Sequence, residues 1–178
     1  MVSLILDAVI DVVCRYGIKR ATMDELARGS GVSRQTLYDR YGNKDGVIAA
    51  AITMAKSRTE EALRAELAPL KALDDKIETY FAVAVWPVYE RMRSMPDAAD
   101  LERGLGQKSR AASTEAAHNR RGILAGMLSE HALRPGQTPQ DIAVFFDQSC
   151  GRAKNVFRNP GRACVLSCSL EGFDDCAD

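Results

Sequence analysis

The sequence predicts an all-α protein in which a small N-terminal helical domain precedes a larger helical domain. Apolar residues recur at helical spacing (i, i+3, i+4) along most of the 178-residue chain. No segment sustains the alternation of apolar and polar residues that indicates a strand. The composition is 46% hydrophobic but only 6% aromatic, with few runs of β-branched residues, which also favours helices. A chain of this length buries a substantial core and forms one domain or two small ones.

The first helix is expected over residues 3–17, with one apolar face made of Ile5, Ala8, Val9, Val12, Val13 and Tyr16. Gly17 supplies the left-handed residue that ends such a helix. A second, short helix is expected after Thr22, because Glu25 three residues later completes the pattern of a capping box. This helix is expected to close at Gly31.

A third short helix follows, with Ser33 as its N-cap and Gly42 at its end. The turn between the two short helices is only three residues long, so residues 22–42 are predicted to form a helix-turn-helix supported by the first helix. A fourth helix is expected from the Asn43 cap and Lys44 to about Ala68, before Pro69.

The rest of the chain is also predicted to be helical. A broad apolar face runs along residues 77–92, and Pro87 is expected to kink or break that helix after Val85. A short helix or loop is expected around residues 96–107, and a long helix at about 109–133. Two more helices are expected at about 138–157, with Thr138 as N-cap, and 162–173. With these the chain has about nine helices.

Charge alone excludes little, because Lys plus Arg and Asp plus Glu are both 24. Between Arg15 and Lys44 we count seven basic and three acidic residues. This local excess fits a nucleic-acid footprint, but a solvated helix face explains it equally well. No apolar run is long enough for a membrane span, the N-terminus lacks a basic signal-peptide region, and no CxxC pair is present. We therefore expect a soluble, cytoplasmic protein.

The polar residues of the segment 30–46 do not have the pattern of a catalytic or metal site. The Gly31–Gln35 segment lacks the second glycine of a nucleophile elbow and has no strand before it. His118 and His131 are 13 residues apart without an evident carboxylate or serine partner. Cys164 and Cys168 lie one helical turn apart, but a fourth metal ligand is missing. No enzymatic activity, metal or cofactor is expected.

DNA binding fits the helix-turn-helix better, because the second helix of such a motif enters the major groove by its N-terminal turns. Leu37 and Tyr41 are expected to point into the core with Val32. The residues suited to reading base edges are then Arg34, Gln35 and Asp39. The residues suited to holding phosphates are Thr36, Tyr38, Arg40 and Lys44. An amphipathic helix pair with a merely solvated polar surface would show the same pattern.

The segment ILDAVIDVVCRYGIKRATMDELARGSGVSRQTLYDRYGNKDGVI, residues 5–48, resembles the DNA-binding domain of the TetR family (tetracycline-repressor-like regulators). The resemblance lies in Ile5-Leu6-x-Ala8, Gly17, Thr22, Leu26-Ala27, Gly31-Val32-Ser33, Thr36-Leu37-Tyr38, Tyr41 and Lys44. The resemblance implies a homodimer that binds a palindromic double-stranded DNA operator, usually as a repressor. It also implies that Thr22 and Ser33 contact phosphates. Gly46 departs from the family pattern and is expected to loosen the start of the fourth helix.

The resemblance divides the chain into a DNA-binding domain, residues 1–46, and a ligand-binding and dimerisation domain, residues 47–178. It implies that helices 138–157 and 162–173 form the dimer interface, although they would also serve to complete the monomer core. The expected ligand lining is Tyr80, Phe81, Trp86, Tyr89, Met92 and His118, which favours an apolar or aromatic effector. A stripe of aromatic and methionine side chains would also serve as plain core. A thiol-based regulator of the same fold, oxidised at Cys150, Cys164 or Cys168, is the alternative.

Overall fold

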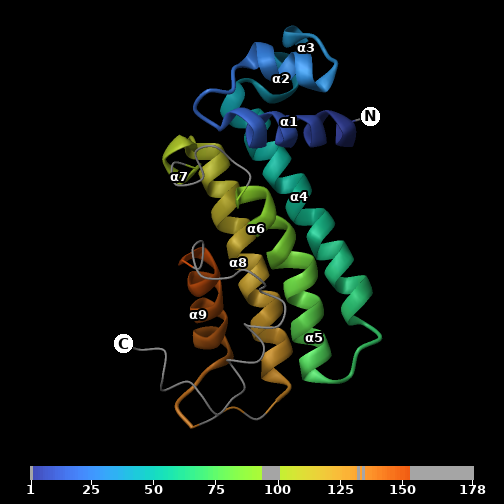
Figure 1. Ribbon diagram of the computed structural model, residues 1–178, viewed down its shortest axis with the longest axis vertical. Helices are drawn as coiled ribbons and strands as arrows, with labels where there is room; N and C mark the ends of the chain where they lie inside the picture. The colour runs from blue at the N-terminus through green and yellow to red at the C-terminus, as the bar shows by residue number, and fades with distance from the viewer. Residues whose placement is uncertain (1, 94–100, 132, 134, 153–178) are drawn as a thin grey trace. The chain divides into compact units, whose positions relative to one another are not determined.

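The computed structural model describes residues 2–93, 101–131, 133 and 135–152 (Figure 1), and over these residues it contains helices and no strands. The helices in chain order are α1 (Val2–Tyr16), α2 (Met23–Ser30), α3 (Arg34–Tyr41), α4 (Lys44–Leu67), α5 (Leu73–Tyr80), the π-helix η1 (Phe81–Val85), α6 (Trp86–Arg93), α7 (Leu101–Gly104), α8 (Gln107–Ser129) and α9 (Pro139–Arg152). The all-α prediction is confirmed. The count of about nine stays a prediction, because the helix expected at 162–173 lies outside the described residues.

The described residues form two compact units. One consists of the described residues within 1–60 and 90–119, and the other of the described residues within 61–89 and 120–178. Helices α4 and α8 each contribute residues to both units. The functional boundary predicted after residue 46 stays a prediction, and the core of the first unit includes Val47, Ile48 and Ala51, which lie beyond it.

The core of the first unit joins four helices. Val9 of α1, Leu26 of α2, Leu37 of α3 and Val47 of α4 are each 0% exposed. The inward direction predicted for Leu37 is confirmed, and Val32 and Tyr41 pack against the same core. On α1 the predicted apolar face is buried at Ile5, Val9, Val12 and Val13. Tyr16, predicted on that face, is exposed instead, because it is the last residue of the helix.

The start of α8 is held by a carboxylate from α4. Asp45 accepts hydrogen bonds from the backbone N–H of Lys108 at 2.8 Å and of Ser109 at 3.0 Å, and the Ser109 hydroxyl also donates to it. A carboxylate at this place satisfies free amides at the helix N-terminus and complements the helix dipole. Gly106 permits the approach, since a Cβ there would lie 2.5 Å from Asp45 Cγ.

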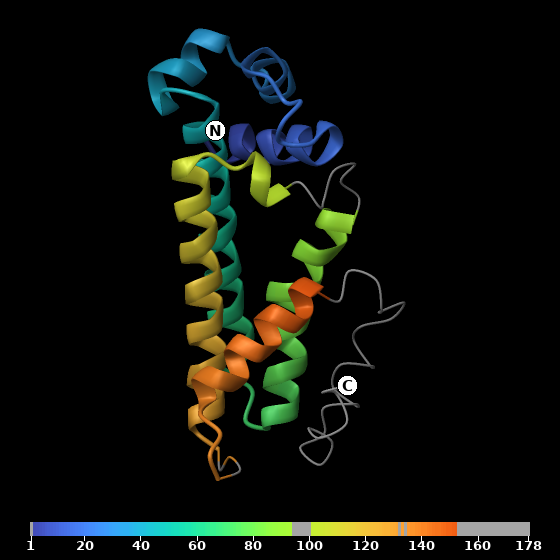
Figure 2. The same cartoon turned by 90° about the vertical axis from the view of Figure 1, so that its left-hand side faces the viewer.

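Within the first unit, the first half of α8 runs beside the first half of α4 (Figure 2). Two polar pairs join them: Lys56 Nζ lies 2.6 Å from Glu115 Oε1, and Asn119 donates to Glu60 at 2.9 Å. Glu115 is exposed, so this ion pair contributes little by itself. Together with the Asp45 cap, these contacts fix the register of the two helices within the unit.

Gly46 has a packing role that the sequence did not indicate. Asn43 caps α4 as expected, with its Oδ1 accepting from the Gly46 N–H at 2.9 Å. A Cβ on Gly46 would lie 2.1 Å from the carbonyl oxygen of Tyr41. Glycine therefore allows α3 and α4 to meet closely at this corner, whereas its expected effect was only to loosen α4.

The core of the second unit is formed by α4, α5, η1, α8 and α9, and its buried members include Leu63, Tyr80, Ala84, Leu124, Leu128, Ile142 and Ala143. The buried Tyr80 donates its hydroxyl to the carbonyl of Arg120 at 3.2 Å. The cap predicted for the last described helix is confirmed, because Thr138 Oγ1 accepts from the Asp141 N–H at 3.1 Å and α9 begins at Pro139.

The break expected near Pro87 takes the form of the π-helix η1. The Trp86 N–H bonds to the carbonyl of Phe81, five residues earlier, and α6 starts at Trp86 with Pro87 in its first turn. Proline has no N–H and its ring crowds the carbonyl four residues before it, so a locally wider helix accommodates it. The π-turn also rotates the following residues, and Val88, predicted on the apolar face, is 44% exposed.

No helix among the described residues has both the length and the apolar character needed to span a bilayer.

We expect Gly46→Ala to lower the free energy of unfolding by about 1–3 kcal/mol, because the added methyl group must displace the Tyr41 carbonyl. The matched control is Gly122→Ala in α8, where a Cβ meets no atom within 4 Å. There the better helix propensity of alanine adds up to about 1 kcal/mol. Urea unfolding of both variants makes the comparison, and equal behaviour of the two would contradict the packing role of Gly46.

The Asp45 cap predicts a pH-dependent contribution to stability. Burial by itself raises the pKa of Asp45, but the hydrogen bonds from Ser109 and from the amides of Lys108 and Ser109 outweigh it and hold the pKa below its ordinary value of 3.8. The ionised carboxylate therefore stabilises the fold above that value, and the contribution is lost as the pH falls below it. Asp45→Asn should be less stable than the wild type at pH 6, and the deficit should shrink by pH 2.5. A deficit that is the same in urea unfolding at both pH values would rule this out.

Candidate nucleic-acid interface

Helices α2 and α3 meet through a tight turn whose geometry depends on Gly31. This residue has φ of 67°, in the left-handed region that favours glycine. Its N–H donates to the carbonyls at the end of α2, and the Val32 N–H donates to the Ala27 carbonyl at 3.2 Å. These bonds satisfy the last carbonyls of α2 while the chain reverses into α3. The predicted helix-turn-helix is confirmed.

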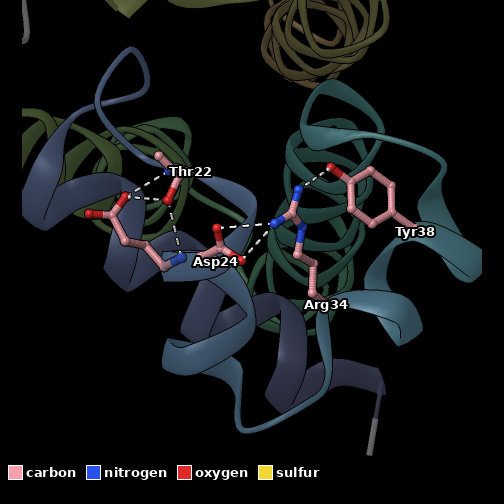
Figure 3. Close-up of polar contacts among 5 residues, drawn as sticks. Thr22, Asp24, Arg34 and Tyr38 are labelled. Atoms are coloured by element: carbon pink, nitrogen blue, oxygen red, sulfur yellow. Dashed lines mark hydrogen bonds and ion pairs between the residues drawn. The ribbon is translucent and has the colours of Figure 1, made fainter.

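Both short helices begin with a side-chain cap. Thr22 Oγ1 accepts from the Glu25 N–H at 3.3 Å, and Glu25 Oε2 accepts from the Thr22 N–H at 2.7 Å (Figure 3). The predicted capping box is thus complete. At α3, Ser33 Oγ accepts from the Thr36 N–H at 3.0 Å, and the two hydroxyls lie 2.8 Å apart. Each cap fixes the first turn of a helix of only eight residues.

Arg34, in the first turn of α3, reaches across to α2. Its Nη1 lies 3.1 and 3.2 Å from the two carboxylate oxygens of Asp24, and its Nη2 donates to the Tyr38 hydroxyl at 3.4 Å (Figure 3). The guanidinium carbon is 5.4 Å from the centre of the Tyr38 ring, a cation–π distance. The hydroxyl of Tyr38 and the charge of Asp24 both raise the pKa of Arg34.

Asp24 is the residue of this surface that sequence reasoning missed. Nothing in the local sequence pattern links Asp24 to a side chain ten positions later. The contact arises from the turn at Gly31, which places the start of α3 against the start of α2. The available signal for this contact was the combination of a predicted helix-turn-helix with an acidic residue at the second position of its first helix.

Among the other polar residues of α3, Gln35, Asp39 and Arg40 are exposed, whereas Thr36 is half-buried. Gln35 Nε2 donates to Asp39 Oδ1 at 2.7 Å, one helical turn away, and Arg40 is exposed at the end of the helix. The three residues predicted to read bases, Arg34, Gln35 and Asp39, thus all lie on the exposed surface of α3. Their roles in binding stay predictions.

Lys44, predicted to hold a phosphate, also has a structural role. Its Nζ donates to the carbonyls of Ile18 and Ala21, each at 3.0 Å, so the ammonium ties α4 to the connection between α1 and α2. An ammonium has three N–H donors, so one remains for another acceptor. The two carbonyls lie more than twenty residues earlier in the chain, which explains why the pattern around Lys44 did not reveal this contact.

The residues predicted to line a ligand site are partly described. Tyr80 is buried, Phe81 and Trp86 are half-buried, and His118 is exposed. Phe81 packs edge-on against Tyr80 and against Phe146, with ring centres 5.7 Å apart in both pairs. The side chains of Tyr89 and Met92 lie outside the described residues. Phe146 of α9 is an aromatic neighbour that the sequence grouping did not include.

One of the five cysteines, Cys14, has its side chain among the described residues. No group of three or more His, Cys, Asp or Glu side chains suited to a metal comes together within the described ranges. Cys14 is a free, half-buried thiol, and burial raises its pKa, with Asp11 adding to the effect and Arg91 opposing it. The side chains of Cys150, Cys164, Cys168 and Cys176 lie outside the described residues.

Helices α2 and α3 are short, each begins with a side-chain cap, and the turn at Gly31 joins them, while α1 shares a buried core with both. Arg34 and Gln35 lie at the start of α3, and Lys44 lies at the start of α4. This arrangement defines a helix-turn-helix DNA-binding domain. In agreement with this, residues 5–51 match the family model described as bacterial regulatory proteins, tetR family. Residues 5–51 are thus similar to the DNA-binding domain of TetR-family transcriptional regulators.

Solved structures of similar fold span most of the chain. A putative TetR-family transcriptional regulator from Rhodococcus sp. is 17% identical with a TM-score of 0.69, and the match covers 93% of this chain and 94% of that one. The fatty acid degradation regulator FadR from Bacillus halodurans is also 17% identical, with a TM-score of 0.67 and coverage of 85% and 86%. A putative transcriptional regulator from Pseudomonas aeruginosa PAO1 has the same identity and TM-score, with coverage of 95% and 86%. A comparison with curated protein sequences gave no match.

The double contact of Lys44 predicts that its removal destabilises the fold. In Lys44→Met the aliphatic stem is largely kept but the ammonium is lost, so two partly buried carbonyls lose their charged donor. We expect the free energy of unfolding to fall by about 1–3 kcal/mol. Lys71→Met, at an exposed loop position, is the control and should change stability by less than about 0.5 kcal/mol. Chemical denaturation of the two variants without DNA distinguishes this role from phosphate binding alone, which would leave Lys44→Met as stable as the control.

Proposed function

We propose that this protein is a TetR-family regulator, and that it acts as a homodimeric repressor binding a palindromic DNA operator in the cytoplasm. It releases the operator when a small, apolar or aromatic ligand binds to residues 47–178. The observation that carries the DNA-binding part is the exposed surface of α3. Its first two residues, Arg34 and Gln35, are the side-chain types that pair with guanine and adenine edges in the major groove.

Residues next to those proposed to read bases are suited to bind the DNA backbone and so to orient α3 on the duplex. Thr22, Ser33, Thr36, Tyr38 and Arg40 carry hydroxyl or guanidinium groups beside the base-reading residues, and Lys44 follows at the start of α4. Groups of this kind hold phosphates and set the register of a protein on DNA, whereas base contacts supply the specificity. Asp39 is suited to accept from cytosine N4.

The proposal of a dimer follows from the size of one reading surface. A recognition helix of eight residues reaches only a short half-site, and helix-turn-helix proteins gain specificity by reading two half-sites about 34–36 Å apart. Of the predicted interface helices, the first corresponds to α9, which is described as far as Arg152, and the second, 162–173, lies outside the described residues. The dimer is therefore proposed from the family resemblance and from this geometric requirement.

The proposal of an apolar effector has two supports. Tyr80, Phe81 and Phe146 gather apolar and aromatic surface in the second unit. Two regulators of similar fold act in the metabolism of apolar compounds: FadR regulates fatty acid degradation, and AlkX of Dietzia is implicated in biodegradation of n-alkanes. AlkX is 17% identical with a TM-score of 0.52, and the match covers 92% of this chain and 88% of that one.

The thiol-based alternative was placed on Cys150, Cys164 and Cys168, whose side chains lie outside the described residues, so no described contact supports it. In the ligand-based mechanism the effector binds better to the conformer whose recognition helices do not fit successive major grooves, so binding of ligand and of DNA oppose each other.

Enrichment of double-stranded DNA from a random pool with the purified full chain tests the function. A specific regulator binds the enriched duplex at least about 1,000-fold more tightly than random DNA at physiological salt. Equal affinity for both, or no enrichment, would contradict the proposal.

Two single variants then separate base reading from phosphate binding. Arg34→Ala should reduce the preference at one base pair of each half-site by about 1–3 kcal/mol, because a bidentate contact to a base edge is lost. Arg40→Ala should weaken the enriched and the random duplex by the same factor and lower the slope of log affinity against log salt by about 1 per lost contact. Titrations of both variants at several salt concentrations make the comparison, and the assignment of Arg34 fails if it changes affinity as uniformly as Arg40.

A further inference from the structure

The contact between Asp24 and Arg34 joins the two helices of the DNA-binding motif at the place where bases would be read. Both carboxylate oxygens of Asp24 lie within 3.2 Å of Arg34 Nη1, and Tyr38 accepts from Nη2 at 3.4 Å (Figure 3). The guanidinium is therefore held from two sides. Its two partners come from different helices, Asp24 from α2 and Tyr38 from α3.

The guanidinium remains able to bind a base while it is held. The side chains of Arg34 and Asp24 are 54% and 65% exposed, so the pair is accessible from solvent. Arginine has five N–H donors, and these contacts use at most three of them. At least two donors stay available, which is the number that a guanine edge accepts through O6 and N7.

Asp24 is itself on a rigid element. It is the second residue of α2, directly after the buried Met23 and within the first turn that the Thr22–Glu25 capping box fixes. A free arginine side chain carries about 2 kcal/mol of rotamer entropy, and an arginine that is already oriented loses less of it on binding. An anchored carboxylate is thus suited to fix the direction of a base-reading guanidinium.

We propose that Asp24 is a specificity-determining positioning residue, which orients the Arg34 guanidinium for one base pair of each half-site and does not itself contact DNA. The proposal rests on the proposed DNA-binding function. In this role Asp24 affects the discrimination between base pairs. An acidic residue of α2 then joins Arg34, Gln35 and Asp39 of α3 in setting the operator sequence.

A purely repulsive role for Asp24 predicts a different result. A negative charge on a surface that approaches DNA weakens the binding of every duplex, so its removal would strengthen binding to all sequences alike. Positioning through Arg34 instead predicts a loss of discrimination, and one that depends on the presence of Arg34. The two roles are separable in a double-mutant cycle.

The test measures the affinity of the full chain for the enriched duplex and for the same duplex with one base pair replaced, at the position whose preference Arg34→Ala alters. The ratio of the two affinities is the discrimination. The variants are Asp24→Asn, Asp24→Asn in the Arg34→Ala background, and Asp11→Asn. The last is the charge-matched control, because Asp11 is an exposed residue of α1 outside the Asp24–Arg34 contact.

We expect Asp24→Asn to reduce the discrimination about twofold to fivefold, the range that an exposed ion pair supports, and to have no effect on it in the Arg34→Ala background. Asp11→Asn should leave the discrimination unchanged. Unchanged discrimination in Asp24→Asn, or the same change with and without Arg34, would overturn the proposal, as would an Arg34→Ala variant that alters no base preference. If the wild type enriches no DNA, the proposed function itself fails, and thermal unfolding of each variant identifies any loss that comes from misfolding.

Discussion

The first unit depends on the contacts made at the start of α4. Three successive residues there each join α4 to a different part of the chain: the Lys44 ammonium binds the carbonyls of Ile18 and Ala21, the Asp45 carboxylate caps α8, and Gly46 allows the Tyr41 carbonyl to approach. Each position depends on its own side chain. A shorter cation at residue 44 would not reach both carbonyls, an amide at residue 45 would lack the charge of the cap, and a methyl group at residue 46 would collide with the Tyr41 carbonyl. The helix-turn-helix and the first half of α8 are therefore anchored to the same helical turn.

Most of the secondary structure could be predicted from the sequence because the determining interactions are local. The Thr22–Glu25 box, the Ser33 and Thr138 caps and the glycine at residue 31 act over three or four residues, and all are present. The inward direction of Leu37 followed from helical spacing in the same way. Predictions of this kind need only the sequence within one helical turn.

The features that could not be predicted depend on distant residues or on a change of helical period. Lys44, Asp45 and Asp24 find their partners 10 to 64 residues away, and no local pattern marks such pairs. Across η1 the helix takes one extra residue per turn, so a face read at constant period from α5 to α6 loses its register and includes the exposed Val88. Phe146 was missed because α9 meets the Phe81 aromatic group only in the folded second unit.

One of the residues proposed to read bases is already hydrogen-bonded in the free protein. Asp39 accepts from Gln35 Nε2 at 2.7 Å, so this carboxylate occupies a donor that a DNA base would otherwise engage. In the proposed complex, a duplex read by Gln35 competes with this built-in acceptor, whereas the Asp24–Arg34 contact leaves at least two guanidinium donors available. A sequence that offers well-placed base acceptors can replace the Gln35–Asp39 bond, whereas one that offers only phosphates gains less from doing so. The protein thus carries a competitor of its own, which raises the threshold that an incorrect site has to exceed.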